Sequence, residues 1–564
     1  MVRTTLSFGT QAFEANHIPG ARAEAQAHST LRPSSHVAVR AVRAATLLTM
    51  LVVGTACGGG GDSAEDAPTA GVDAPTAGVD APTAGVDEPI AATEAAQSAW
   101  QSCVRAPAAA PLGSVQRDVR SFGAKPDDNI DDSDAIQKAL DTMKAGETLW
   151  FPSGRYLMNR SLFVRKPGIT IAGDRATLHA TNPDDLALII QADDTTVASM
   201  TFTAITNGRR NATRHSRIAV SGDLPGGLRR IRNTVIRDNR ITNADGPGTA
   251  GANSASTAGI FINHAERFLV SGNTVVRSLA DGIHISGGSR NGRVLNNVVR
   301  ETGDDMIAVV GYSDAGSPAK NNASKLVKAW QTNVEDRLNR NILISGNRVS
   351  GQYAGRGISV VGGQTIAIVR NTIENVPVGA GILLAREASY QTFGVENILV
   401  ESNILRDVQT GAPPYDGANK FAPNKRTGHG AIEVHAALFD DEAGTPSLRE
   451  VLGVRNVIVR NNTIERSAVA AVRAGVPVNQ TIRDGDASRH AGNGVIENLS
   501  VQGNRFEAVK GEAIYVLGQD LQEHGLHCSG NQRDGKDYRP SSCKAPEPAL
   551  RGLPIACSAD GRLL

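Results

Sequence analysis

The sequence contains few aromatic residues and almost no net charge. Of its 564 residues, 4% are Phe, Trp or Tyr, and 58 Lys and Arg face 57 Asp and Glu, for a net charge of +1. Because bulk positive charge drives binding to nucleic acids and to membrane surfaces, neither partner is predicted. No phosphate-binding loop is present, and the glycines punctuate turns, which argues against nucleotide-dependent chemistry. The shortage of aromatic side chains suits a thin core filled by aliphatic residues.

The sequence also lacks a long apolar run and closely spaced cysteine pairs. The apolar run Ala44–Val53 is too short for a membrane-spanning helix, which needs about 20 residues. Cysteine occurs 5 times, and no two cysteines form the CxxC pair typical of a metal site. In an exported protein, disulfides can form, but spacing does not give the pairing among Cys103, Cys528, Cys543 and Cys557.

The N-terminal segment has the order expected of an export signal. Arg40 and Arg43 precede the apolar run, and small residues then lead to Cys57. This order resembles a bacterial lipoprotein signal, in which the Cys is lipidated and becomes the first residue. We therefore predict a leader over residues 1–57, lipidation at Cys57, and a cell-envelope lipoprotein at the outer membrane or cell surface. The alternative is an ordinary secretory signal cleaved nearby, which would give a secreted protein.

Residues 58–114 are predicted to be a disordered linker. The heptapeptide APTAGVD occurs three times in succession over residues 67–87. Such a density of Ala, Pro, Gly and Asp buries too little apolar surface to order the chain. The segment would act as a tether, so the folded domain would contact a membrane through its lipid anchor only.

An Asn recurs along the rest of the chain inside one short apolar pattern, as in VSGNTVV and IVRNTI. Self-similarity of this length predicts a solenoid of stacked coils, with neighbouring strands roughly 4.8 Å apart. We predict an all-β fold, a right-handed parallel β-helix over residues 115–520, followed by a Cys-containing tail over residues 521–564. Stacked Asn side chains would form a hydrogen-bonded ladder. The series comprises Asn239, Asn273, Asn296, Asn347, Asn371, Asn403, Asn462 and Asn504.

A second pattern aligns five coils on each other. Each coil carries two aliphatic residues that alternate with an outward residue, as in Ile283-His284-Ile285. The position two residues before the first aliphatic residue is charged on three successive coils and alanine on both flanking coils. The aligned residues are Ala258, Asp281, Asp305, Arg356 and Ala380.

Three carboxylates should meet in this charged column. Asp304 precedes Asp305, and His284 lies one outward step from Asp281. Neighbouring carboxylates raise each other's pKa, so that a protonated and an ionised carboxyl can coexist, as acid–base cleavage of a glycosidic bond requires. The alternative is a solvated polar column in which Arg356 neutralises the two aspartates.

The beginning of the predicted domain resembles a known superfamily. Residues 120–134 contain the turn FGAKPDDNIDDSD, a short amphipathic helix follows to about Met143, and TLWFPSGRYL occupies residues 148–157. This order resembles the pectate-lyase/rhamnogalacturonase-type β-helix superfamily, in which a capping helix starts the solenoid. The resemblance implies the fold, and it leaves hydrolases, lyases, epimerases and tailspikes open.

The charged column is similar to the polygalacturonase family of glycoside hydrolases. Ala280-Asp281-Gly282 and Gly303-Asp304-Asp305 stand where that family has NTDG and GDD, and Gly355-Arg356-Gly357 stands where it has GHG. The resemblance implies an extracytoplasmic polysaccharide-degrading hydrolase, with Asp281, Asp304 and Asp305 as the acid–base carboxylates of an inverting reaction. Inversion requires a carboxyl separation of roughly 6.5–9.5 Å. His284, Arg356 and His429 (in a literal GHG two coils on) are predicted to bind substrate.

Two other functions stay open. The Asp residues could hold Ca²⁺ in a uronate lyase or epimerase, with Arg356 as base; the hydrolase needs no cofactor and no metal. The fold could also be a non-catalytic glycan-binding module. The partner would in each case be a polysaccharide, bound by a monomer. An acidic polysaccharide could be bound by clustered arginines, or these could lie in solvated loops: Arg209, Arg210, Arg214, Arg229 and Arg230.

Overall fold

The computed structural model describes the part of the chain that follows the predicted linker. The described residues are 115–242, 254–313, 334–352, 354–411, 426–439, 451–475, 480–484, 487–517 and 525–543, with 328, 331, 332, 442, 445 and 448. The predicted leader and linker, Cys57, Cys103 and Cys557 lie outside these ranges. Within these ranges, no helix combines the length and the apolar character that a membrane crossing requires.

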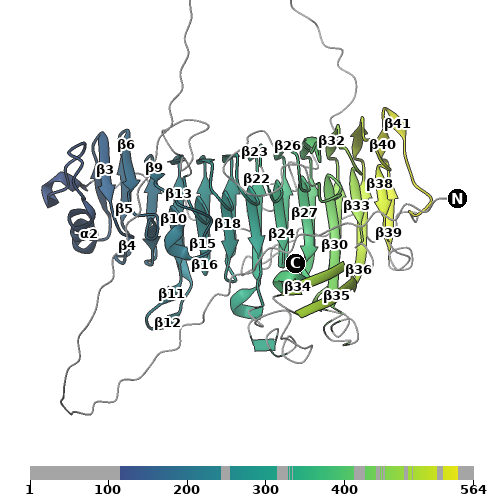
Figure 1. Cartoon of the computed structure of the whole chain (residues 1–564), viewed down its shortest axis with the longest axis horizontal. Helices are drawn as coiled ribbons and strands as arrows, with labels where there is room; N and C mark the ends of the chain where they lie inside the picture. The colour runs from purple at the N-terminus through teal and green to yellow at the C-terminus, as the bar shows by residue number, and fades with distance from the viewer. Residues whose placement is uncertain are drawn as a thin grey trace, which may run out of the picture. The chain divides into compact units, whose positions relative to one another are not determined.

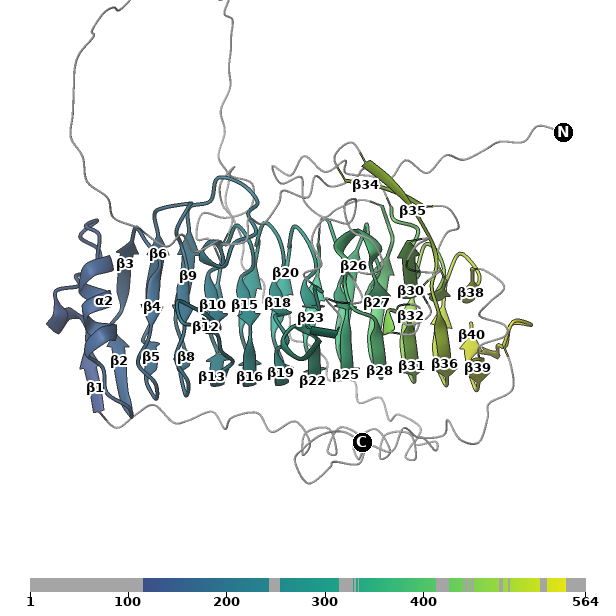
Figure 2. The ribbon, with the colours of Figure 1, turned by 90° about the horizontal axis from the view of Figure 1, so that it is seen from below.

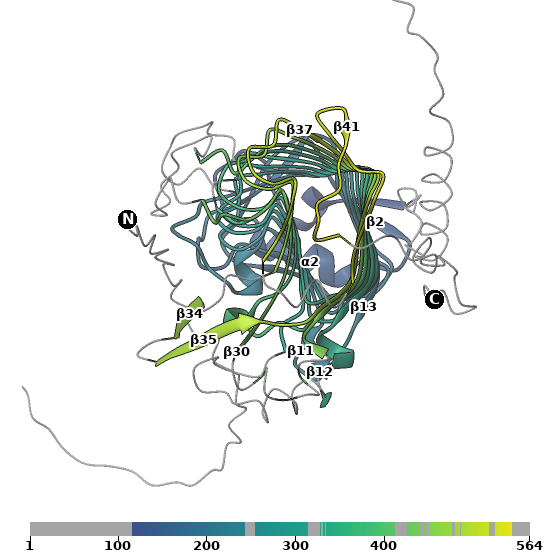
Figure 3. The ribbon, with the colours of Figure 1, turned by 90° about the vertical axis from the view of Figure 1, so that its right-hand side faces the viewer.

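The described chain folds as a right-handed parallel β-helix, as predicted. Three 13-stranded sheets run side by side, and each coil contributes one strand to each sheet in turn. Figure 1 and Figure 2 show the coils following one another from the N-terminal to the C-terminal strands. Figure 3, which looks along the stack, shows the three sheets around one interior.

The first sheet, which we call sheet A, is parallel throughout. Its strands, in spatial order, are β1 (Val115–Asp118), β2 (Glu147–Phe151), β5 (Thr170–Gly173), β8 (Thr196–Ala198), β13 (Ile231–Arg237), β16 (Ala265–Ser271), β19 (Arg290–Leu295), β22 (Asn339–Ser345), β25 (Gly363–Val369), β28 (Val395–Glu401), β31 (Val454–Arg460), β36 (Ile496–Gln502) and β39 (Leu526–Ser529).

Sheet B is parallel up to its last strand, which is antiparallel to its neighbour. Its strands are β3 (Gly154–Met158), β6 (Ala176–Ala180), β9 (Thr201–Ala204), β14 (Arg240–Ile241), β17 (Thr274–Val276), β20 (Val298–Arg300), β23 (Arg348–Ser350), β26 (Thr372–Val376), β29 (Ile404–Val408), β32 (Thr463–Glu465), β37 (Arg505–Glu507), β40 (Gln532–Arg533) and β41 (Lys536–Asp537).

Sheet C carries the charged column at its strand starts. Its parallel strands are β4 (Leu162–Val164), β7 (Leu188–Ile190), β10 (Ile218–Ser221), β15 (Ile260–Asn263), β18 (Ile283–Ser286), β21 (Ile307–Val310), β24 (Ile358–Val361), β27 (Ile382–Arg386), β30 (Ile432–Phe439), β33 (Val472–Ala474) and β38 (Ile514–Val516). The hairpin β34 (Gln480–Asp484) and β35 (Ala487–Asn493) joins β30 in antiparallel pairing.

Short elements complete the fold at its beginning and along its loops. The predicted helix is α2 (Ser133–Thr142), which buries Ile136, Ala139 and Leu140 at the start of the solenoid. Asp132 precedes it and accepts hydrogen bonds from the backbone N–H groups of Lys125 and Leu157. The remaining elements are the 3-10 helices η1 (Val119–Phe122), η2 (Thr213–His215) and η3 (Ala388–Tyr390) and the hairpin β11 (Asp223–Leu224) with β12 (Gly227–Leu228).

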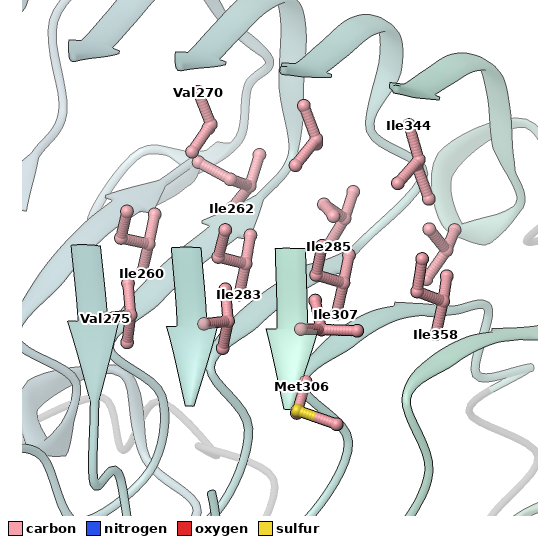
Figure 4. Packing of buried hydrophobic residues seen from close by; sticks show 14 of the residues in the cluster. Ile260, Ile262, Val270, Val275, Ile283, Ile285, Met306, Ile307, Ile344 and Ile358 are labelled. Carbon is pink, nitrogen blue, oxygen red and sulfur yellow. The ribbon is translucent and has the colours of Figure 1, made fainter. Parts of the chain in front are cut away.

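Stacked aliphatic side chains fill the interior. Ile260, Ile283, Ile307 and Ile358 are aligned on successive strands of sheet C and are fully buried. Figure 4 shows these columns facing the aliphatic residues of the other sheets. Burying one such side chain contributes about 1.5–3 kcal/mol, so the repeat itself supplies the stability.

The Asn ladder is present, with one error in the predicted series. In the VLNNVV coil, Asn297 occupies the ladder and Asn296 precedes it with a left-handed φ of +54°. Each ladder side chain bonds the next one, as when Asn371 Nδ2 donates to Asn403 Oδ1 at 3.0 Å. The ladder also extends to Asn531, which sequence analysis missed.

The β-helix continues past its predicted end at residue 520. Strands β39 and β40 add a further coil to sheets A and B. Next to them, Cys528 and Cys543 form a disulfide, a pairing that spacing alone could not give.

Candidate functional site

The register of sheet C confirms the predicted charged column. Ile260, Ile283, Ile307, Ile358 and Ile382 pair in that order, so the residues two positions earlier lie on successive coils. Backbone bonds join them, since Gly282 N–H donates to Asp305 O at 3.0 Å and Met306 N–H donates to Arg356 O at 2.9 Å. Asp281, Asp305 and Arg356 therefore stand side by side.

Three carboxylates meet in this column, and we call Asp281, Asp304 and Asp305 the acid trio. One oxygen from each lies within 4.8 Å of the others. Their side chains differ in exposure, with 26% for Asp304, 13% for Asp281 and 6% for Asp305. Asp305 is therefore buried, whereas Asp304 stays partly accessible to solvent.

Asp305 is held by two donors from the next coil. The backbone N–H of Arg356 donates to Oδ1 at 2.7 Å, and the Ser359 hydroxyl donates to Oδ2 at 2.5 Å. Burial raises the pKa of Asp305 to about 7, with Asp304 and Asp281 adding to the rise against the opposing effects of Arg356 and Ser359. One carboxyl of the trio is therefore protonated up to neutral pH.

The other two carboxylates have partners of their own. The Arg209 guanidinium, from the loop between β9 and η2, donates to Asp304 Oδ2. Although burial works to lower it, Asp304 and Asp281 raise the pKa of Arg209 above its usual value. His284 Nδ1 lies 2.5 Å from Asp281 Oδ2.

Arg356 connects the acid trio to the next coil. Its guanidinium lies 3.5 Å from Asp305 Oδ1 and donates to Glu387, which directly follows β27. Burial works to lower the pKa of Arg356, but Glu387 and Asp305 raise it above its usual value. Gly355 permits this close stacking, because its φ is +79° and a Cβ would lie 2.5 Å from Asp304 Oδ1.

Two aromatic rings contact His284, the partner of Asp281. His284 stacks on Tyr312 with ring centroids 6.4 Å apart and contacts Phe261 at 5.2 Å. Burial raises the pKa of Tyr312 well above its usual value, with Asp281 and Tyr390 contributing. Tyr390, at the end of η3, is 45% exposed.

A second polar cluster, the histidine cluster, comprises His429, Glu433 and His435. One donor atom from each lies within 4.8 Å of the others. Arg473 clamps both oxygens of Glu433 at 2.7 and 2.6 Å. Burial works to raise the pKa of Glu433, but His429, His435 and Arg473 lower it to about 2.

His429 was the member of the histidine cluster expected to bind substrate. Burial lowers the pKa of His429 to about 3, so that its imidazole is neutral. Arg356 also contributes to this lowering, which places His429 within electrostatic reach of the site.

The predicted arginine clusters do not present free guanidinium groups. Each of these arginines lies within 4.0 Å of a carboxylate oxygen, and the partner of Arg209 is Asp304, as described above. The pairs are Arg210 with Asp184 (3.0 Å), Arg214 with Asp185 (3.7 Å), Arg229 with Asp193 (2.8 Å) and Arg230 with Asp336 (3.4 Å). A surface that holds an acidic polysaccharide through unpaired arginines is therefore not built from these residues.

The structure adds residues that sequence analysis missed. Glu387 and Ser359 contact the site from neighbouring coils, and Glu433 and His435 accompany His429. Arg209 was expected only as a member of the arginine clusters, and its contact with Asp304 was not. The sequence signal for Glu387 and Ser359 was the coil alignment. It places Glu387 directly after the strand that follows Ala380, and Ser359 in the strand that follows Arg356. Arg209 comes from a loop with no such alignment.

The acid trio offers hard oxygen ligands, but they suit Ca²⁺ poorly. Ca²⁺ takes six to eight oxygens. Both oxygens of Asp305 already accept hydrogen bonds, and guanidinium groups contact Asp305 and Asp304. A divalent cation would have to displace these cations or be repelled by them.

Comparisons with known proteins agree with the fold. Residues 116–313 match the family model described as rhamnogalacturonase A/epimerase, pectate lyase-like, and residues 258–425 match the model of the right-handed beta helix region. These matches confirm the predicted relationship to the pectate-lyase/rhamnogalacturonase-type β-helix superfamily. No curated protein matches the sequence.

Solved structures with a similar fold include carbohydrate-active enzymes. The catalytic domain of a GH87 alpha-1,3-glucanase in complex with tetrasaccharides is 14% identical, with a TM-score of 0.49 over 75% of this chain and 70% of that chain. The mannuronan C-5 epimerase AlgE4 A-module of Azotobacter vinelandii is 14% identical, with a TM-score of 0.47 over 76% of this chain and 100% of that chain. These likenesses concern the fold alone.

Proposed function

We propose that this chain is a glycoside hydrolase that cleaves a polysaccharide by acid–base catalysis at the acid trio. The observation that carries the proposal is the division within the trio. Asp305 keeps a proton up to about pH 7, while Asp304 and Asp281 lie next to Arg209 and His284. A protonated and an ionised carboxyl within reach of one bond are what glycoside hydrolysis needs.

Each carboxyl has a role in this reaction. The proton that Asp305 holds in the free enzyme passes to the leaving glycosidic oxygen, and the ionised Asp304 or Asp281 activates water or attacks the sugar. Asp304, the most exposed of the three, is the one best placed to meet substrate.

The short separation within the trio bears on stereochemistry. Oxygens within 4.8 Å of one another are closer than the roughly 6.5–9.5 Å that inversion requires. The distance of 4.8 Å joins the nearest oxygens and not the carboxyl groups as a whole, so the separation implied by the polygalacturonase resemblance stays a prediction. Proton NMR of the first product released would give the anomeric configuration directly.

The lyase and epimerase alternatives receive less support. A catalytic base must lose its proton, and the ion pairs with Glu387 and Asp305 hold the proton on Arg356. A non-catalytic binder would gain nothing from a buried carboxyl of raised pKa, which destabilises the fold above neutral pH.

The chemistry can be tested on a panel of polysaccharides, with and without chelator. Hydrolysis predicts new reducing ends, no absorbance from unsaturated uronates, and no effect of chelation. Unsaturated products that disappear on chelation would contradict the proposal and indicate a lyase.

The cellular location is a separate proposal. The Cys528–Cys543 disulfide supports an oxidising compartment, and Cys57 would anchor the chain to the cell envelope. A Cys57→Ser variant should move from the membrane to a soluble extracytoplasmic fraction. Retention of the variant on membranes would contradict lipidation at Cys57.

A further inference from the structure

The arginines around the acid trio and the histidine cluster are all engaged by carboxylates of this chain. Arg209 pairs with Asp304, Arg356 pairs with Glu387 and Asp305, and Arg473 grips Glu433 through two bonds. Among the described residues of these two clusters, three arginines thus face five carboxylates. The two clusters together carry an excess of negative charge, even when Asp305 is protonated.

A uronate polymer presents a carboxylate on every sugar. Recognition of a carboxylate calls for an available cation, most often an arginine that can form two parallel hydrogen bonds. Here every arginine near the trio is already bound to an acid, and the remaining negative charge would repel a further carboxylate. Arg210, Arg214, Arg229 and Arg230 are paired with carboxylates in the same way.

Exposed aromatic surface favours a sugar without charge. Tyr390 is 45% exposed, and its backbone N–H donates to the carbonyl of Glu387, the partner of Arg356, at 3.3 Å. The face of such a ring packs against the apolar face of a pyranose, and ionised carboxylates accept hydrogen bonds from sugar hydroxyls. Neither interaction needs a charged group on the ligand.

We propose that the substrate of this site is a neutral hexose polymer, without carboxylate, sulfate or phosphate groups. This rests on the proposed function in locating the site at the acid trio, and it adds the substrate class. It also argues against the alternative in which the clustered arginines bind an acidic polysaccharide.

The test compares polymers that differ only in charge. Polygalacturonate and mannuronan would each be paired with its carboxyl-reduced form, and neutral glucans with their C6-oxidised forms. Binding of the full chain with Asp305→Asn, which limits turnover, would be measured by affinity electrophoresis at low ionic strength. In any pair that the protein binds, we expect the neutral polymer to bind at least tenfold more tightly than its charged form. This difference in affinity should be smaller in high salt. A uronate member that binds as tightly or more tightly, or no binding across the pairs, would overturn the proposal.

A pair of charge variants sharpens this test. Glu433→Gln releases Arg473 and should raise uronate binding severalfold relative to neutral-glycan binding. Glu401→Gln is the matched control, because it releases Arg460 from a similar 2.7 Å ion pair on sheet A and should change neither. Equal effects of the two variants would contradict the assignment.

Activity separates the two proposals. Cleavage of a uronate polymer by the wild type through hydrolysis would keep the proposed function and overturn the neutral substrate. Selective binding of a neutral glycan without any hydrolysis would support the neutral substrate and contradict the proposed function.

Discussion

The Asn ladder and the acid trio are two polar columns on the same coils, and they are built in opposite ways. In the ladder, every coil repeats one neutral side chain, and each amide donates to the next oxygen, as from Asn347 to Asn371 and from Asn371 to Asn403, at 2.9 and 3.0 Å. In the acid trio, neighbouring coils differ, and like charges lie within 4.8 Å. In the ladder, neighbouring side chains satisfy each other's hydrogen bonds. In the acid trio, neighbouring carboxylates repel each other.

This difference indicates that the Asn ladder serves stability and that the acid trio serves function. A buried neutral group with its hydrogen bonds made stabilises the fold modestly, whereas neighbouring buried carboxylates destabilise it unless one is protonated. A solenoid could place the same neutral, hydrogen-bonded side chain on every coil at each position. This protein does not do so at the starts of β18, β21 and β24. Breaks in an otherwise repeated pattern are expected at functional sites.

The largest expected effect comes from removing the titrating member of the trio. Asp305→Asn keeps the size of the side chain and removes its exchangeable proton, so hydrolysis of the true substrate should fall by about 10²–10⁴-fold. The initial rate of reducing-end release measures the loss. Asp134→Asn, on the 96% exposed side chain of α2, should leave the rate unchanged. Near-full activity of Asp305→Asn would contradict the catalytic role of the trio, which would then be a structural column like the Asn ladder.

The second prediction concerns the stability cost of the trio. The pKa of Asp305 is raised from about 3.9 in the unfolded chain to about 7 in the folded chain. Its contribution is therefore fully present below pH 4 and is lost as pH rises through 7, by up to about 4 kcal/mol. Denaturant unfolding at pH 5 and pH 8 should show this loss in the wild type and a smaller one in Asp305→Asn. The same pH dependence in both proteins would contradict the assignment to Asp305.

The third prediction addresses the ladder. Asn371→Ala leaves the buried Ile344 carbonyl and the Asn347 N–H without the partners that lie 3.0 and 2.9 Å away. We expect a loss of about 3 kcal/mol in the free energy of unfolding, since each unsatisfied buried group costs about 1–3 kcal/mol. Activity per folded molecule should not change.

A loop asparagine provides the control for the ladder variant. Asn182→Ala, half-buried and bonded to the Asp184 N–H, should cost under about 1 kcal/mol. A loss of activity in folded Asn371→Ala protein would mean that the ladder also shapes the site.

Sequence was sufficient for the architecture because the coil is a repeated unit. The alternation of aliphatic and outward residues and the Asn series fix the register of neighbouring coils, and the structure confirms both the fold and the alignment of Asp281, Asp305 and Arg356. The error at Asn296 arose because two consecutive asparagines both fit the pattern. Only the left-handed conformation of the first, required by the turn, distinguishes them.

The surroundings of the trio could not be predicted to the same degree. Burial of Asp305 depends on Ser359 and Arg356 packing across it, and sequence gives the coil but not the depth of a side chain. Arg209 reaches Asp304 from a loop that no periodicity aligns. Loops carry no register, so their contributions to a site appear only in the structure.

The smallest expected effect tests how finely the trio is tuned. The Ser359 hydroxyl donates to Asp305 at 2.5 Å and favours its ionised form, so Ser359→Ala should raise the pKa of Asp305 further. If the Asp305 proton is the catalytic acid, activity falls as pH rises through that pKa, and the alkaline limb of kcat/KM should move up by about 0.5–1 pH unit. Ser286→Ala is the matched control, because this buried serine of sheet C donates to the Val310 carbonyl at 3.0 Å instead of to a carboxylate. It should lower stability without moving the limb. An alkaline limb that stays in place or moves down in Ser359→Ala would show that the proton used in catalysis is not the one that Asp305 holds.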